Sequence, residues 1–200
     1  MNIIRPISID EMIAEFLKAE LHSSRFREGS LKALSILGFG EELLENPDIE
    51  DPDQNKKRER VLGLCRGWPN KELFTKFPED TRWFRVNISQ EELGESYRLK
   101  SSSTMSDQER LISETSNKLK SGTEVKNINP KLIGEIQAKI LANQELPPII
   151  LVAQDLNGKF VLIEGHSRSV AYCSVDKKYS YKAIPAIIGI SKSMDDWDYF

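Results

Sequence analysis

The sequence predicts an α+β fold, in which a sheet combines with helices and follows a helical N-terminal extension. Residues 83–88 alternate between apolar and polar side chains, as a half-buried strand does. Ile149–Ala153 and residues 160–163 are apolar runs on either side of an Asn-Gly turn, which is typical of a β-hairpin. Before and between these segments, apolar residues recur at helical spacing.

Residues 1–80 are predicted to form a mainly helical extension packed on the core, and residues 81–200 the core itself. Helical patterns cover residues 8–21, 30–37 and 54–64. The last of these begins with a basic run, residues 56–60. This run is either a phosphate-contacting face or a solvated helix surface, and the acidic stretches around it favour the solvated surface.

The core begins with the strand at 83–88, and several predicted helices follow it. Ser89 with Glu92 predicts a short helix, and a longer helix is expected over residues 107–120. The polar residues 100–106 between them are either a loop that closes over a ligand or a plain connector. Asn129 followed by Pro130 begins another helix.

Composition narrows the classes of protein. With 39% hydrophobic and 30% charged residues, the 200-residue chain can build a core without disulfides or a structural metal. Two cysteines without a CxxC partner and two histidines predict no metal site and buried, unreactive thiols. No segment has the length of a membrane span, so a cytoplasmic location is expected. The net charge of −3 argues against DNA as a partner.

The segment with most chemical character runs from Phe160 to Tyr172. An apolar strand leads through Glu164 and Gly165 into a helix whose inner side carries Val170 and Ala171. A strand, a glycine and a helix start in this order make an anion site, because the free N–H groups of the first turn point outward. The alternative is a tight turn in which the arginine at 168 pairs with a structural carboxylate.

The residues 163–168, read I-E-G-H-S-R, together with the later 184–188, I-P-A-I-I, resemble the conserved box of the ParB/sulfiredoxin superfamily. The similarity covers residues 132–190 and is strongest to the D-G-H-T-R-A subgroup, which includes nucleotide-dependent free-serine kinases. Partition proteins of the superfamily carry a G-E-R-R version that binds the CTP triphosphate. This chain has Glu164 for Asp, Ser167 for Thr and Ser169 for Ala. Sulfiredoxin itself is disfavoured, because His166 stands where its reactive cysteine falls.

The resemblance implies a small mixed sheet with helices and a nucleotide-binding site. The ligand would be a nucleoside di- or triphosphate with Mg²⁺, held by residues of the box. These cofactor-binding residues are Gly165, His166, Ser167 and Arg168. If phosphate is transferred to the hydroxyl of a small molecule, or the nucleotide is hydrolysed, a carboxylate base is also needed. The catalytic candidates are Glu164 and, by analogy with the glutamate after the first strand of the serine kinases, Glu91, Glu92 and Glu95.

The alternative function is a non-catalytic module in which nucleotide occupancy regulates contact with a partner or with DNA. The partition proteins act in this way, but they continue into a helix-turn-helix and a dimerisation domain. Only ten residues follow the last predicted strand here. The acidic charge also argues against a CTP-clamped DNA slider.

Overall fold

The computed structural model describes residues 1–100, 105–125, 128–176 and 183–200. Its centre is a five-stranded mixed sheet with the strand order β1-β2-β5-β3-β4. β5 and β3 are parallel, and the other neighbours are antiparallel. The strands are β1 (Asn2–Ile7), β2 (Arg82–Ile88), β3 (Ile149–Ala153), β4 (Val161–Glu164) and β5 (Ile184–Ile190).

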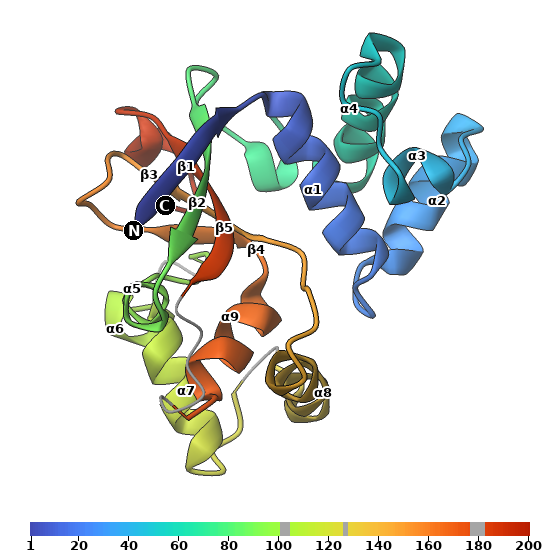
Figure 1. The fold of residues 1–200 in the computed structure, drawn as a ribbon. Helices are drawn as coiled ribbons and strands as arrows, with labels where there is room; N and C mark the ends of the chain where they lie inside the picture. The colour runs from blue at the N-terminus through green and yellow to red at the C-terminus, as the bar shows by residue number, and fades with distance from the viewer. Residues whose placement is uncertain (101–104, 126–127, 177–182) are drawn as a thin grey trace.

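Helices cover both faces of this sheet, so the molecule has three layers (Figure 1). One face carries α1 (Ile9–Leu21), α2 (Arg27–Leu37), α3 (Glu42–Glu45), α4 (Pro52–Arg66) and the 3-10 helices η1 (Glu72–Phe74) and η3 (Met194–Asp196). The other carries α5 (Gln90–Gly94), α6 (Asp107–Arg110), α7 (Ile112–Lys120), α8 (Pro130–Leu141) and α9 (His166–Ser174). The mixed α+β class predicted from the sequence is confirmed.

The alternation of strand residues divides the core between the two faces. Ile150 and Val152 of β3 pack with the α1–α4 side, while Ile149, Leu151 and Ala153 pack with the α5–α9 side. All five are buried, as expected for a strand covered by helices on both faces. The interior strand β3 therefore contributes to the core on both faces of the sheet.

The ends of the N-terminal helices agree with the predicted ranges only in part. α1 matches its range, but α2 begins at Arg27 rather than at residue 30, and α4 runs from Pro52 to Arg66 rather than over 54–64. The short helix α3 was not predicted. The Ser8 hydroxyl accepts the N–H of Glu11 at the start of α1. α4 has Asp51 as its N-cap, with Pro52 in the first turn, and ends at Gly67, whose φ is +80°. α1 lies against the sheet, and α2, α3 and α4 pack on its outer side (Figure 1).

β1 is a strand that the sequence did not predict. It pairs with β2 at the edge of the sheet, with a bulge at Ile4, and most of its residues are exposed. The bulge removes the two-residue alternation, and Pro6 is a residue that strands tolerate mainly at edges. Residues 2–7 therefore belong to the sheet, and the helices α1–α4 are inserted between two neighbouring strands.

Two predicted features differ in detail. The helix expected over residues 107–120 is interrupted at Leu111, which has extended dihedral angles and forms a bridge with Tyr97. The β3–β4 connection spans residues 154–160, so the Asn-Gly pair is part of a longer loop. Of the predicted loop at 100–106, residues 101–104 lie outside the described residues.

The basic run at the start of α4 is not uniformly solvated. Arg58 is fully buried, and its Nη2 donates to the carbonyl of Asp48 at 2.7 Å. Its neighbours Lys57 and Arg60 lie over the ring of Phe39. The run therefore anchors the loop before α4. Neither predicted role, a phosphate-contacting face or a solvated helix surface, accounts for this contact.

None of the helices in the described ranges combines the length and the apolar character needed to cross a bilayer.

Candidate functional site

The turn between β4 and α9 requires a glycine. Gly165 has a φ of +96°, a region that residues with a Cβ rarely adopt. A Cβ at this position would lie 3.2 Å from Nη2 of Arg168 and 3.3 Å from the Cα of Ile149. The left-handed turn and the close approach together bring the last residue of β4 directly against the first turn of α9.

The first turn of α9 carries unpaired backbone donors. In any α-helix the first N–H groups have no acceptor within the helix. Within the part of the chain that the structure describes, no side chain caps α9, and the N–H of Gly165 donates to Oε2 of Glu164. The N–H groups of His166, Ser167 and Arg168 thus form the positive end of the helix dipole, as the sequence predicted.

Arg168 pairs with a carboxylate of its own turn. Its Nη2 donates to Oε1 of Glu164 and to the carbonyl of Pro148, both at 3.2 Å. Its Nε is buried and has no hydrogen-bond partner within the described residues. The hydrogen-bonding capacity of the arginine is therefore only partly used. Its pairing with Glu164 is the structural ion pair that the sequence analysis gave as the alternative to an anion site.

His166 is neutral at pH 7. The pKa of its imidazole is lowered from 6.5 to about 4, mainly by burial and also by the charges of Arg98, Arg25 and Arg168, while the charge of Glu164 opposes the shift. Three guanidinium groups therefore act on one side chain at the start of α9.

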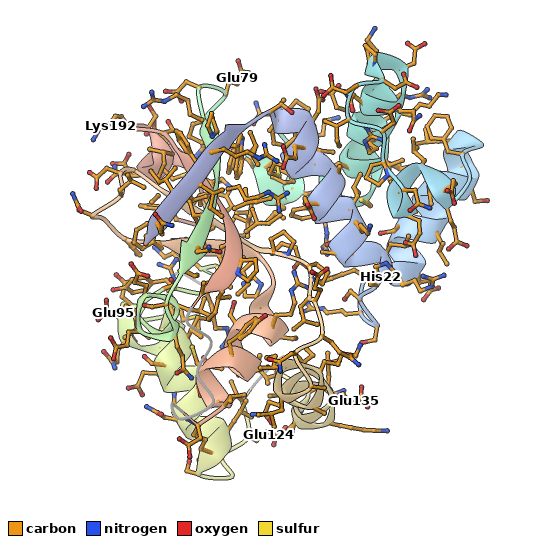
Figure 2. The ribbon with its side chains drawn as sticks, in the orientation of Figure 1. His22, Glu79, Glu95, Glu124, Glu135 and Lys192 are labelled. Atoms are coloured by element: carbon orange, nitrogen blue, oxygen red, sulfur yellow. The ribbon has the colours of Figure 1, made fainter. Side chains whose placement is uncertain are left out.

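Two of these arginines come from outside the sequence motif. Arg25 lies in the turn after α1, whose end is marked by His22 in Figure 2, and Arg98 follows α5. A buried ion pair also lies nearby, since the charge of Glu164 acts on Glu20, which pairs with Arg66. Sequence reasoning missed these residues because Arg98 and Arg25 lie 68 to 143 positions before His166 and Arg168 in the chain. No local pattern connects residues so far apart, and only the fold brings their charges together.

The other predicted catalytic glutamates lie elsewhere. α5 packs on the C-terminal half of α9, where Nε2 of Gln90 donates to the carbonyls of Tyr172 and Val175. These positions are six and nine residues beyond His166, which is roughly 9–14 Å along a helix. Glu164 is therefore the one member of the predicted catalytic set that lies at the turn itself.

Each of the three α5 glutamates has a different setting. Glu92 forms a capping box with Ser89, and its other oxygen contacts the N-terminal ammonium of Met1. Glu95 is exposed on the side of α5 away from α9 (Figure 2). Glu91 is exposed on the same short helix. The structure does not bring these carboxylates to the start of α9.

Both cysteines lie in surroundings that make their thiols unreactive. Burial raises the pKa of Cys65 and of Cys173 to about 12, so each remains a protonated thiol at neutral pH. Cys173 lies on the body of α9, where its Sγ is 3.8 Å from the carbonyl of Gln90. These environments support the prediction that neither thiol is a nucleophile.

The described side chains do not form a ready-made metal site. Across these ranges, no three His, Cys, Asp or Glu residues are grouped so that they could hold an ion. Glu164, the carboxylate at the turn, is already bonded to Gly165 and Arg168. The residues present therefore do not fit a protein-held Mg²⁺, which nucleotide sites usually bind through phosphate and water as well.

Comparisons with protein-family models, with curated proteins and with solved structures found no match.

Proposed function

We propose that this chain is a nucleotide-binding protein of the ParB/sulfiredoxin type, and that it holds the nucleotide phosphates at the N-terminus of α9. The observation that carries the proposal is the uncapped first turn of α9 beside Arg168, whose Nε is buried without a hydrogen-bond partner among the described residues. The charges of Arg25 and Arg98 also act on His166 in this turn. Guanidinium groups and helix N-terminal N–H groups are the usual protein donors to phosphate.

The resemblance supports the same place independently of the charges. The I-E-G-H-S-R segment that resembles the superfamily box forms the end of β4 and the first turn of α9. The mixed sheet also agrees with the fold that the resemblance implies. The ParB/sulfiredoxin fold itself remains part of the proposal.

Nucleotide binding is tested by comparing two arginine variants. Arg168→Ala should weaken binding of the nucleotide for which the wild type has the highest affinity. The expected loss is roughly 1.5–3 kcal/mol, or about 10- to 100-fold, the range for charge-assisted hydrogen bonds. Calorimetric titration with ATP, ADP, CTP and GTP, with and without Mg²⁺, measures the change.

The matched control is Arg82→Ala. Arg82 is exposed and aligns with Ile190, at the end of the sheet opposite to Glu164. Its removal deletes the same charge and should leave nucleotide affinity unchanged. Equal affinities in wild type and in Arg168→Ala would remove the site from α9.

Phosphate transfer or hydrolysis is the second candidate function, with Glu164 as the base. Its carboxylate is bonded to Gly165 and Arg168, so nucleotide must displace Arg168 before Glu164 can take a proton from an acceptor hydroxyl or from water. This arrangement favours binding over chemistry, and so supports the alternative of a nucleotide-responsive regulatory module.

A turnover assay separates these two functions. If phosphate or nucleoside diphosphate is released, Glu164→Gln should abolish the release while nucleotide affinity stays within a few-fold. The variants Glu91→Gln, Glu92→Gln and Glu95→Gln serve as controls that should retain turnover. No turnover by the wild type, together with measurable nucleotide binding, would assign the chain to the regulatory class.

A further inference from the structure

Arg98 lies in a segment that extends the sheet beyond β4. Tyr97 forms a parallel bridge with Val161, its N–H donates to the carbonyl of Phe160, and its own carbonyl accepts the N–H of Leu162, both at 2.8 Å. Because the two segments run in the same direction, the chain after Tyr97 follows β4 toward Glu164 and the start of α9.

The side chain of Arg98 points to the face where α9 lies. Tyr97 and Leu99 pack against the cluster on the α1–α4 side of the sheet. Successive side chains of an extended segment alternate, so Arg98 faces the other side. There its Nη1 lies 3.5 Å from the hydroxyl of Thr115 on α7.

Arg98 is poorly satisfied for a partly buried charge. Its Nε is buried without a hydrogen-bond partner, and its guanidinium makes no ion pair with a carboxylate, as far as the described residues go. Burial alone lowers its pKa. A charge in such a place is costly unless something else compensates it.

Two other buried arginines show the usual arrangement. The guanidinium of Arg110 donates to Asp107 at 2.9 Å, to the carbonyl of Arg98 at 2.9 Å and to the carbonyl of Tyr199 at 3.2 Å. Arg58 also has an unpaired Nε, but both of its terminal nitrogens bond to oxygens nearby. Among the described residues, the only acceptor for the Arg98 side chain is the Thr115 hydroxyl. The charge of Arg98 acts on His166, at the proposed phosphate site.

We propose that Arg98 is a ligand-binding residue, which with Arg25 and Arg168 recognises a diphosphate or longer phosphate chain. This inference rests on the proposed function and adds Arg98 and Arg25 to the residues that bind its ligand. One phosphate group can be held by a helix N-terminus and a single arginine. Three guanidinium groups offer more donors and more charge than one phosphate can use, and they match two or more adjacent phosphates.

The position of Arg25 adds a structural consequence. It lies in the turn that joins α1 to α2, while Arg98 and Arg168 belong to the sheet and to α9. A phosphate chain bound by all three would connect the helical layer α1–α4 with the opposite face of the sheet.

The test measures affinity and stability in the same variants. The probes are pyrophosphate and inorganic phosphate, titrated into the full chain. Wild type should bind pyrophosphate more tightly than phosphate. Arg98→Met should weaken pyrophosphate binding about 10- to 100-fold, while its free energy of unfolding without ligand stays the same or rises, because an uncompensated buried charge is removed.

Arg110→Met is the matched control, since it removes a buried arginine that is fully bonded. It should lower the free energy of unfolding. Arg25→Ala provides a second probe whose folding is not in question, because Arg25 is exposed. It should weaken pyrophosphate binding several-fold with little change in phosphate binding.

The possible outcomes distinguish the assignment of Arg98 from the proposed function. Arg98→Met that keeps its pyrophosphate affinity, or that loses stability as Arg110→Met does, overturns the assignment of Arg98. If Arg168→Ala weakens nucleotide binding in the same experiments, the proposed function survives that failure. A wild type that binds neither pyrophosphate nor any nucleotide overturns both, and equal affinity for phosphate and pyrophosphate overturns the polyphosphate ligand alone.

Discussion

Two carboxylate–arginine pairs near the start of α9 differ in how firmly they are made. Glu20, which is only 2% exposed, lies in the last turn of α1 and receives Nε of Arg66 at 2.7 Å and also its Nη2. The Arg66 guanidinium stacks 3.7 Å from the ring centroid of Phe26. The Glu164–Arg168 pair is a single contact of 3.2 Å between residues four apart.

The difference separates a structural pair from an exchangeable one. Glu20 and Arg66 connect the ends of α1 and α4, so breaking the pair leaves a buried charge and separates two helices. Glu164 keeps a hydrogen bond from Gly165 when Arg168 leaves it. A phosphate can therefore take Arg168 from Glu164 at little expense of stability, which suits a binding site.

The largest expected effect is the loss of the structural pair. Arg66→Met should lower the free energy of unfolding by about 3–5 kcal/mol, because Glu20 remains buried without its partner. Arg168→Met should lower it by less, about 1–3 kcal/mol, because Glu164 is also buried but keeps the hydrogen bond from Gly165. Urea denaturation of both variants gives the comparison, and equal losses would mean that the two pairs are of the same kind.

Substitution of the two glycines beside these pairs should give the same order of effects, with the larger loss of stability beside the structural pair. At Gly67 a Cβ would overlap the carbonyl of Lys71, and φ is +80°; at Gly165 the nearest atoms are 3.2–3.3 Å away and φ is +96°. Gly67→Ala should lower the free energy of unfolding by roughly 2–5 kcal/mol and Gly165→Ala by roughly 1–3 kcal/mol. A larger loss at Gly165 in thermal or urea unfolding would contradict this order.

Opposite pH dependences are expected from Glu20 and His166. Burial raises the pKa of Glu20 from 4.5 to about 7, so its contribution to stability is complete below pH 4.5 and is lost as the pH rises through 7. The pKa of His166 falls from 6.5 to about 4, so its contribution is complete above pH 6.5 and is lost as the pH falls through 4. In the wild type the two slopes oppose each other between pH 4.5 and 6.5.

Single variants should reveal each slope. Glu20→Gln should become more stable as the pH rises from 4.5 to 6.5, and His166→Asn should become less stable from pH 4.5 to 7, each by at most about 3 kcal/mol. Urea denaturation at several pH values measures both. The double variant is the control and should be nearly flat, whereas parallel slopes in the two single variants would refute the assigned shifts.

The smallest expected effect on stability comes from a variant that tests the exchangeable Glu164–Arg168 pair. Glu164→Gln keeps an acceptor for the N–H of Gly165 but removes the negative charge beside Arg168. Stability should change by less than about 1 kcal/mol, while affinity for nucleotide should rise a few-fold because Arg168 is released. Unchanged or weaker binding would show that Glu164 does not compete with the ligand.

The sequence was informative wherever local patterns decide the structure. β3 has the predicted bounds, and the capping signals at Ser89 and Asn129 lie where helices begin. The interruption at Leu111 was not predictable from its neighbours. There the N–H of Ile112 donates to Ser96 and the carbonyl of Arg110 accepts from Arg98, so tertiary hydrogen bonds override the helical pattern.

For the site, the sequence predicted the turn but not its surroundings. Gly165 and the first turn of α9 follow from a strand, a glycine and a helix in succession. The contributions of Arg25 and Arg98 arise from strand order and helix placement, which leave no periodic trace in the chain. The roles proposed for the four glutamates remain predictions. Glu91 and Glu92 lie on α5, and Glu95 is its C-cap.

The position of β1 has a consequence for how the chain can change. β1 and β2 are neighbours in the sheet, with Ile7 opposite Trp83, yet the whole α1–α4 layer lies between them in sequence. That layer is a closed loop whose two ends leave the sheet side by side. Loop-closure entropy grows slowly with length, by about 0.6 kcal/mol for each doubling. Exposed connections in this layer, such as the one between α2 and α3 with its exposed Gly38, Gly40 and Glu41, should therefore accept added residues while the strand register and the turn at Gly165 stay unchanged.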